Sequence, residues 1–123
     1  MTHILVYTYA ADNCDQYVQI KKRGSEEEMK DLMYTLAHAH LYEFILRYCE
    51  KDMDEFAIDV DDFKEMETIS VRDDKLYYNE DEIANELDGF FTDVEVSIKP
   101  DLVRFMSTDT NSCIRYELFQ IIS

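Results

Sequence analysis

One long helical pattern constrains the fold of this chain more than any other feature. Ser25 is followed by three glutamates, which places a capping hydroxyl and negative charge where a helix begins. Apolar side chains then recur at three- and four-residue spacing from Met29 to Tyr48, as on one buried face of a helix. A second apolar stripe lies beside the first. We therefore expect a long helix over about residues 25–50 that packs on a sheet, with further cover from a loop or a second subunit.

Strand patterns flank this helix on both sides. Residues 3–11 (HILVYTYAA) are β-branched or aromatic on both alternating faces, which predicts a central strand that is covered on both sides. Residues 16–22 follow a short polar turn and are predicted to be its hairpin partner. After the helix, alternation through Phe56, Ile58 and Val60 predicts a half-exposed strand with an acidic outer face. A short helical turn over about residues 61–67 should follow it.

The C-terminal half predicts a hairpin, a second helix and three more strands. Asp73-Asp74 separates two short strand patterns and predicts a hairpin turn. Asn79, followed by three acidic residues, has the pattern of a helix start, and Gly89 can end that helix. The predicted class is therefore α+β: an antiparallel or mixed sheet packed on one long helix (about 25–50), with a second short helix (about 80–88). The further strands are expected at 69–72, 75–78, 90–98, 102–107 and 113–122.

The length and composition favour one folded domain. At 123 residues and 46% hydrophobic residues, the chain can bury a real core, and we predict a single compact domain over 1–123. Cys14, Cys49 and Cys113 lack CxxC spacing, so they read as reduced thiols of a cytoplasmic protein, in the host cytoplasm if the protein is viral. The N-terminal apolar run is short and has no basic leader, and no stretch has membrane-spanning length.

The negative charge is concentrated in the middle of the chain. Residues 50–95 hold 18 of the 28 acidic residues and only four basic ones, a balance of −14 within the total of −16. Such charge disfavours direct binding to nucleic acid or to an anionic membrane. Concentrating it also costs stability through self-repulsion, so a basic protein partner explains it better than solubility does.

The residues that could support catalysis or bind a metal form no convincing site. His38 and His40 are two apart on a helix and point in different directions, and His40 is expected to be a hydrogen-bonded core residue. The acidic run from Asp52 to Asp61 has Glu55 where a calcium loop needs glycine. No nucleophile elbow, P-loop or dinucleotide-binding motif is present. We predict no enzymatic activity, no cofactor and no specific metal site.

These observations favour a binding protein. On the predicted strand, outward carboxylates two residues apart are separated by about 6.6 Å, and duplex DNA likewise presents regularly spaced negative charge. We predict a small acidic protein that inhibits a nuclease or another basic nucleic-acid-binding protein by presenting DNA-like charge. Viral counter-defence proteins (anti-CRISPR or anti-restriction) and nuclease immunity proteins act in this way. The predicted partner-binding residues are Asp54, Glu55, Asp59, Asp61, Asp62, Glu65, Glu67, Asp73, Asp74, Glu80, Asp81 and Glu82.

An alternative from another class stays open. The chain would be a non-enzymatic adaptor or subunit that binds a basic protein and self-associates through its long apolar helix, possibly as a homodimer. Salt dependence separates the two, because a phosphate mimic weakens as salt rises and an apolar helix contact does not.

Overall fold

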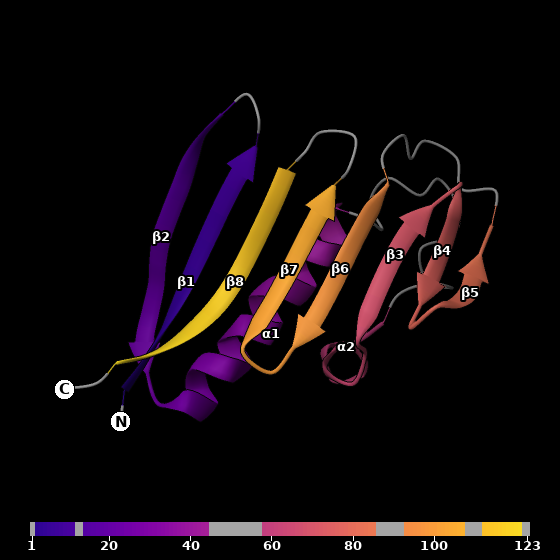
Figure 1. Cartoon of the computed structure of the whole chain (residues 1–123). Helices are drawn as coiled ribbons and strands as arrows, with labels where there is room; N and C mark the ends of the chain where they lie inside the picture. The colour runs from indigo at the N-terminus through magenta and orange to yellow at the C-terminus, as the bar shows by residue number, and fades with distance from the viewer. Residues whose placement is uncertain (1, 12–13, 45–57, 86–92, 108–111, 122–123) are drawn as a thin grey trace.

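A large antiparallel sheet dominates the structure. The computed structural model describes residues 2–11, 14–44, 58–85, 93–107 and 112–121, and Figure 1 shows their arrangement. Strands make up 59% and helices 26% of these residues, so the predicted architecture, a sheet organised on one long helix, is wrong. The eight strands follow the order β2-β1-β8-β7-β6-β3-β4-β5, and all neighbours are antiparallel. The elements are β1 (Thr2–Ala11), β2 (Cys14–Gly24), α1 (Glu26–Phe44), α2 (Val60–Lys64), β3 (Thr68–Arg72), β4 (Lys75–Tyr78), β5 (Asp81–Ala84), β6 (Val94–Lys99), β7 (Leu102–Ser107) and β8 (Ser112–Ile121).

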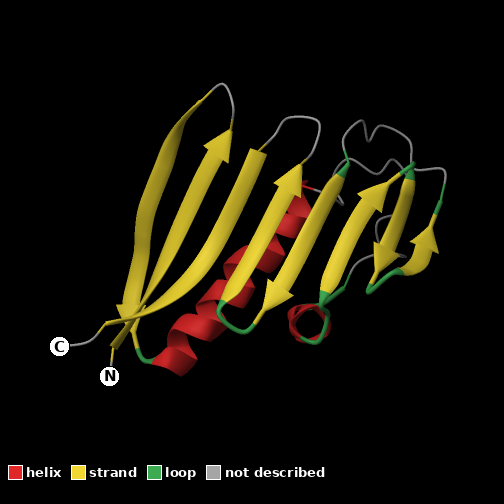
Figure 2. Cartoon of the chain, viewed as in Figure 1, coloured by secondary structure: helices red, strands yellow, loops and turns green. Residues whose placement is uncertain are grey.

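Helix α1 begins where the capping pattern predicts. The backbone N–H of Glu28 donates to Ser25 Oγ at 3.2 Å, and Ser25 Oγ donates to Glu28 Oε1, also at 3.2 Å. This reciprocal pair satisfies one of the free N–H groups of the first turn. The helix then crosses behind the sheet (Figure 2). The rest of the predicted helix, residues 45–50, lies outside the described residues.

The second predicted helix, at about 80–88, is wrong where the structure describes it. Asn79 and Glu80 have φ angles of 50° and 69°, the left-handed conformation that a two-residue hairpin turn requires. Asn79 Oδ1 accepts the N–H groups of Glu67 (2.7 Å) and Thr68 (3.0 Å), so its side chain fixes the turn against β3 and caps no helix. Glu80 completes the turn, Asp81 and Glu82 enter strand β5, and residues 86–88 lie outside the described part.

The other short helix lies where a strand was expected to end. Val60 begins α2, and Asp59 is its N-cap, with Oδ1 accepting the N–H of Asp62 at 2.8 Å. The predicted strand through Phe56, Ile58 and Val60 is therefore wrong over residues 58–60, and residues 56–57 lie outside the described residues. The predicted helical turn near residues 61–67 is confirmed.

The predicted hairpin at Asp73-Asp74 is also confirmed. Both residues have positive φ angles, 52° and 60°, and β3 pairs with β4 around them. Aspartate tolerates this conformation better than most residues, because its short polar side chain can bond locally.

Replacing Asn79 with alanine tests the turn described above. We expect Asn79→Ala to lower the free energy of unfolding by about 1 to 2 kcal/mol, because alanine disfavours positive φ and removes the acceptor for two N–H groups. Asn79→Asp retains both a carbonyl-type oxygen and tolerance of positive φ, so its loss should be less than half as large. Urea unfolding measures both, and equal stability of the alanine variant and the wild type would contradict this account of the turn.

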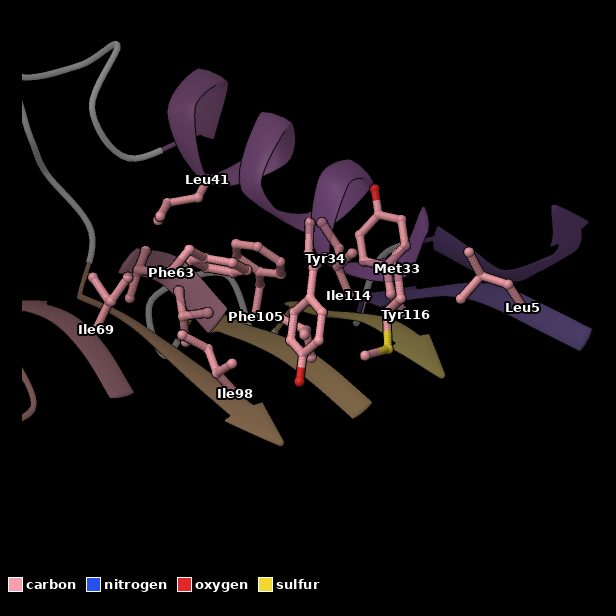
Figure 3. Packing of buried hydrophobic residues seen from close by; sticks show 14 of the residues in the cluster. Leu5, Met33, Tyr34, Leu41, Phe63, Ile69, Ile98, Phe105, Ile114 and Tyr116 are labelled. Carbon is pink, nitrogen blue, oxygen red and sulfur yellow. The ribbon is translucent and has the colours of Figure 1, made fainter. Parts of the chain in front are cut away.

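The buried residues gather between the helices and one face of the sheet (Figure 3). Helix α1 contributes Met33, Tyr34 and Leu41, while Phe63 of α2 inserts beside them and is completely buried. Inward positions of six strands complete the cluster, as their alternation requires. Its members are Leu5, Met29, Met33, Tyr34, Ala37, Leu41, Phe63, Ile69, Val71, Leu76, Val94, Val96, Ile98, Val103, Phe105, Ile114 and Tyr116.

The opposite face of the sheet has no described element over it, as Figure 1 shows from that side. Residues 3–11 do form a strand inside the sheet, as predicted, but the expected cover on both sides is not found among the described residues. Ile4 and Val6 of β1 point to this uncovered side and stay half-buried. Their neighbours on β2, Val18 and Ile20, are 58% and 55% exposed. We call this side the open sheet face.

Candidate protein-binding surface

Exposed carboxylates cover the helical side of the molecule. Helices α1 and α2 pack against each other on the same side of the sheet, joined by an ion pair between Lys64 Nζ and Asp31 Oδ1 at 3.3 Å. We call the exposed acids of these helices and their flanks the acidic helical layer. Its members are Glu26, Glu27, Glu28, Asp31, Glu43, Asp59, Asp61, Asp62, Glu65 and Glu67.

Few of these charges are neutralised within the described residues. Two ion pairs fall in the layer: Lys64 with Asp31, and Lys30 with Glu26 at 4.0 Å. Both carboxylates are also about two-thirds exposed, at 66% and 65%. Ion pairs this exposed are screened by water and contribute little to stability. The carboxylates of the layer therefore keep a strong negative field that can attract a basic partner.

Three interactions fix the position of α2. A helix of five residues is too short to be stable alone. Asp59 caps its first turn, and Phe63 packs its ring edge-on to Tyr34, with centroids 6.5 Å apart. On the adjacent turn of α1, His38 Nε2 donates to the carbonyl of Ile58 at 2.6 Å. The acidic residues of α2 are therefore held by buried contacts on its other side.

The structure brings together some of the predicted partner-binding residues and separates others. Asp59, Asp61, Asp62, Glu65 and Glu67 all lie in the acidic helical layer. The turn at Asn79 sits beside Glu67, which places Glu80 and Asp81 at the same end of the sheet.

The remaining predicted residues lie elsewhere or have partners. Asp73 and Asp74 form the turn at the other end of β3 (Figure 1), with Asp73 roughly 16 Å from Thr68 at about 3.3 Å per residue. Glu80 pairs with Arg72 at 2.8 Å, and Glu82 pairs with Lys75 at 3.8 Å. Asp54 and Glu55 lie outside the described residues.

Sequence reasoning missed the contribution of α1 to this layer. Glu26, Glu27 and Glu28 were interpreted only as the acidic start of a helix, and Asp31 was not singled out. Glu27, Glu28 and Asp31 lie about 100° or more around the helical wheel from the buried Met29 and Met33, which marks them as solvent-facing. Glu26 is exposed in the first turn. The expected row of carboxylates along a strand is wrong, because Asp59 and Asp61 belong to a helix start.

His40 is half-buried and packs against the core, which agrees in part with the prediction of a core residue. Its ring lies 4.7 Å from that of Phe105, and its Nδ1 is 3.5 Å from the Tyr116 hydroxyl. Burial lowers the pKa of His40 and raises the pKa of Tyr116 to about 12, because burial disfavours the charged form of each. The two groups are thus neutral packing partners near pH 7.

The described residues give no support for a metal site, a membrane-spanning helix or a small-molecule pocket. Among the described residues, no three His, Cys, Asp or Glu side chains are placed to hold a metal ion. No helix in that part of the chain is long and apolar enough to span a membrane. A surface hollow of about 230 Å³ is lined by groups of both charges, and it is smaller than the roughly 300 Å³ at which small-molecule sites begin. It is lined by His3, Glu26, Lys30, Pro100, Asp101, Leu118 and Gln120.

The apolar face of α1 is used within the molecule. Met29, Met33, Ala37 and Leu41 are each at most 1% exposed, so they cannot also form a helix-to-helix contact with a second copy unless the core opens. A homodimer through this helix would have to use other side chains of α1, such as the exposed Tyr42, and it stays a prediction.

Comparisons with protein-family models, with curated proteins and with solved structures found no match to this chain.

Proposed function

We propose that this chain binds a basic nucleic-acid-binding protein or nuclease through its acidic helical layer and thereby inhibits it. The single observation that supports this most is the clustering of ten exposed acids on the two helices and their flanks, against two lysines, among the described residues. A Lys- and Arg-lined nucleic-acid channel is complementary to such a layer, and long-range attraction would speed the encounter. Viral counter-defence and nuclease immunity are the roles that fit this activity.

The mode of mimicry differs from the one expected of a strand. Carboxylates on α1 and α2 rise at about 1.5 Å per residue along each helix, so they present a field of charge and not a linear row. Blocking a nucleic-acid channel requires only that this field occupy it with comparable charge density. Our proposal is thus electrostatic competition for a basic channel, without contacts that read a base sequence.

The experiment is a pull-down from host lysate with the tagged full chain at about 50 mM and about 500 mM salt. We expect a basic nuclease or nucleic-acid-binding protein to be retained at low salt and released at high salt, because screening shortens from roughly 14 Å to 4 Å. The captured protein is then assayed for nucleic-acid binding with and without this chain. A target that binds nucleic acid equally well when saturated with this chain would overturn the proposal.

A further inference from the structure

The open sheet face has the opposite charge to the rest of the molecule. In a protein of formal charge −16, the side chains that the strand register directs to this face include more bases than acids. Among the described residues, the bases are Arg23, Arg72, Lys75, Lys99, Arg104 and Arg115, and the acids are Glu82, Glu95 and Glu117.

Two arginines meet at the centre of this face. Arg104 of β7 lies directly opposite Arg115 of β8, and like charges in directly opposed positions destabilise a sheet. Arg104 Nε is shielded from solvent and has no hydrogen-bond partner among the described residues. The carboxylate recorded beside Arg115 is that of Glu117, at 4.0 Å. Within the described part of the chain, the pair thus has a donor that no other group satisfies.

Hydroxyl groups and apolar side chains surround the two arginines. Thr8 lies opposite Arg115, and Ser97 lies opposite Arg104, so one row across the sheet reads threonine, arginine, arginine, serine. Val18 extends this row onto β2. Exposed apolar residues nearby on the same face are Val18 (58%), Ile20 (55%), Phe119 (46%) and Met106 (40%).

We propose that the open sheet face binds an acidic segment of a partner protein, and that Arg104 and Arg115 donate hydrogen bonds to one of its carboxylates. Arginine forks match carboxylate geometry in two parallel hydrogen bonds. Apolar side chains of the same segment would cover Ile20, Phe119 and Met106, which otherwise leave apolar area in water. This surface lies on the side of the sheet opposite the acidic helical layer, so the inference is independent of the proposed inhibition.

A protein segment fits this face better than nucleic acid does. Sheet surfaces that bind single strands use exposed aromatic rings as stacking platforms. Here the residues directly opposite the arginine pair, Thr8 and Ser97, carry hydroxyls. Phe119 is exposed farther along β8, and the Tyr77 ring is occupied by the Arg72 guanidinium, 4.1 Å from its centroid. A long polyanion is also repelled by the formal charge of −16, whereas a short segment with a few carboxylates is repelled less.

The test is a titration of the ¹⁵N-labelled full chain, followed by NMR of the arginine Nε–Hε groups at low salt. The probe is a capped peptide of alternating glutamate and valine, compared with its glutamine counterpart and with a ten-nucleotide oligothymidine. We expect the glutamate peptide to shift the NMR signals of the Arg104 and Arg115 Nε–Hε groups and of the Met106 and Phe119 amides, and these shifts should saturate. The glutamine peptide should leave the same signals unchanged. Arg104→Gln and Arg115→Gln should each weaken binding about tenfold or more, while Lys30→Gln, on the helical side, should not.

Three results would overturn the inference. The arginine signals could stay unmoved by the glutamate peptide. They could respond to the oligothymidine at lower concentration than to the peptide, which would assign the face to nucleic acid. Self-association that perturbs the same signals, seen by sedimentation, would assign it to a second copy.

Thermal unfolding tests whether the arginine pair serves only the stability of the sheet. Relief of the opposed charges should leave the midpoint of Arg104→Gln unchanged or higher. A large fall in that midpoint would instead assign the pair to the stability of the sheet and would also overturn the inference.

Discussion

Replacing Phe63 with alanine is expected to lower the free energy of unfolding by about 3 to 5 kcal/mol. The Phe63 side chain is fully buried and makes edge-on ring contacts with Tyr34 and with His38, at centroid distances of 6.5 Å and 5.7 Å. Truncation removes both contacts and leaves a cavity that the short helix α2 cannot close. Urea unfolding followed by circular dichroism gives the free energy and the m-value.

The matched control is Asp61→Ala, which lies on the exposed side of the same helix. We expect it to change the stability by no more than about 0.5 kcal/mol. Phe63→Leu keeps most of the volume and should lose less than the alanine variant. A loss below about 1 kcal/mol for Phe63→Ala would show that α2 is not anchored as described.

Reversing three charges of the acidic helical layer is expected to weaken binding to the captured basic partner by about 100-fold or more. The variant carries Asp61→Lys, Asp62→Lys and Glu65→Lys, which are exposed and make no ion pair among the described residues. A 100-fold loss corresponds to about 2.7 kcal/mol, within reach when attraction becomes repulsion at three positions. Asp59 is left unchanged, because its carboxylate caps α2.

The control reverses the same number of charges away from the helices. Asp93→Lys, Glu95→Lys and Asp101→Lys together also take the formal charge from −16 to −10, and all three residues are exposed. Binding measured by calorimetry should fall less than about threefold in this variant. Equal losses in the two variants would mean that total charge matters and that the helical layer is not the contact surface.

Local turn and cap chemistry decided which sequence predictions were correct. Ser25 with Glu28, and Asp73-Asp74 between two short apolar runs, each have one dominant local solution, and the structure adopts it. Asn79 followed by acidic residues is compatible with two local structures, because asparagine occurs both as a helix cap and in a left-handed turn. Pairing with β3 selects the turn here, and that preference lies in residues distant along the chain.

The side on which a strand is covered is also not a local property. The apolar alternate positions of β1 predicted cover on both sides, but Ile4 and Val6 face the open side. The number of helices available to cover a sheet depends on the whole chain, so the pattern of one strand cannot predict whether both of its faces are covered. The acids of the candidate site were partly predictable, because each is exposed in its own element. Their grouping depends on how α2 packs against α1.

The order of strands in the sheet has a consequence for synthesis on the ribosome. Strand β1, which starts at Thr2, pairs with β8, which ends at Ile121, so the two strands that are farthest apart in the described sequence are neighbours. At about 5 to 20 residues per second, roughly 5 to 20 s pass between their emergence. During that interval the nascent chain carries an apolar strand edge with unsatisfied N–H and C=O groups. The sheet can therefore close only after β8 has emerged, and until then the edge of β1 is open to pairing with other chains.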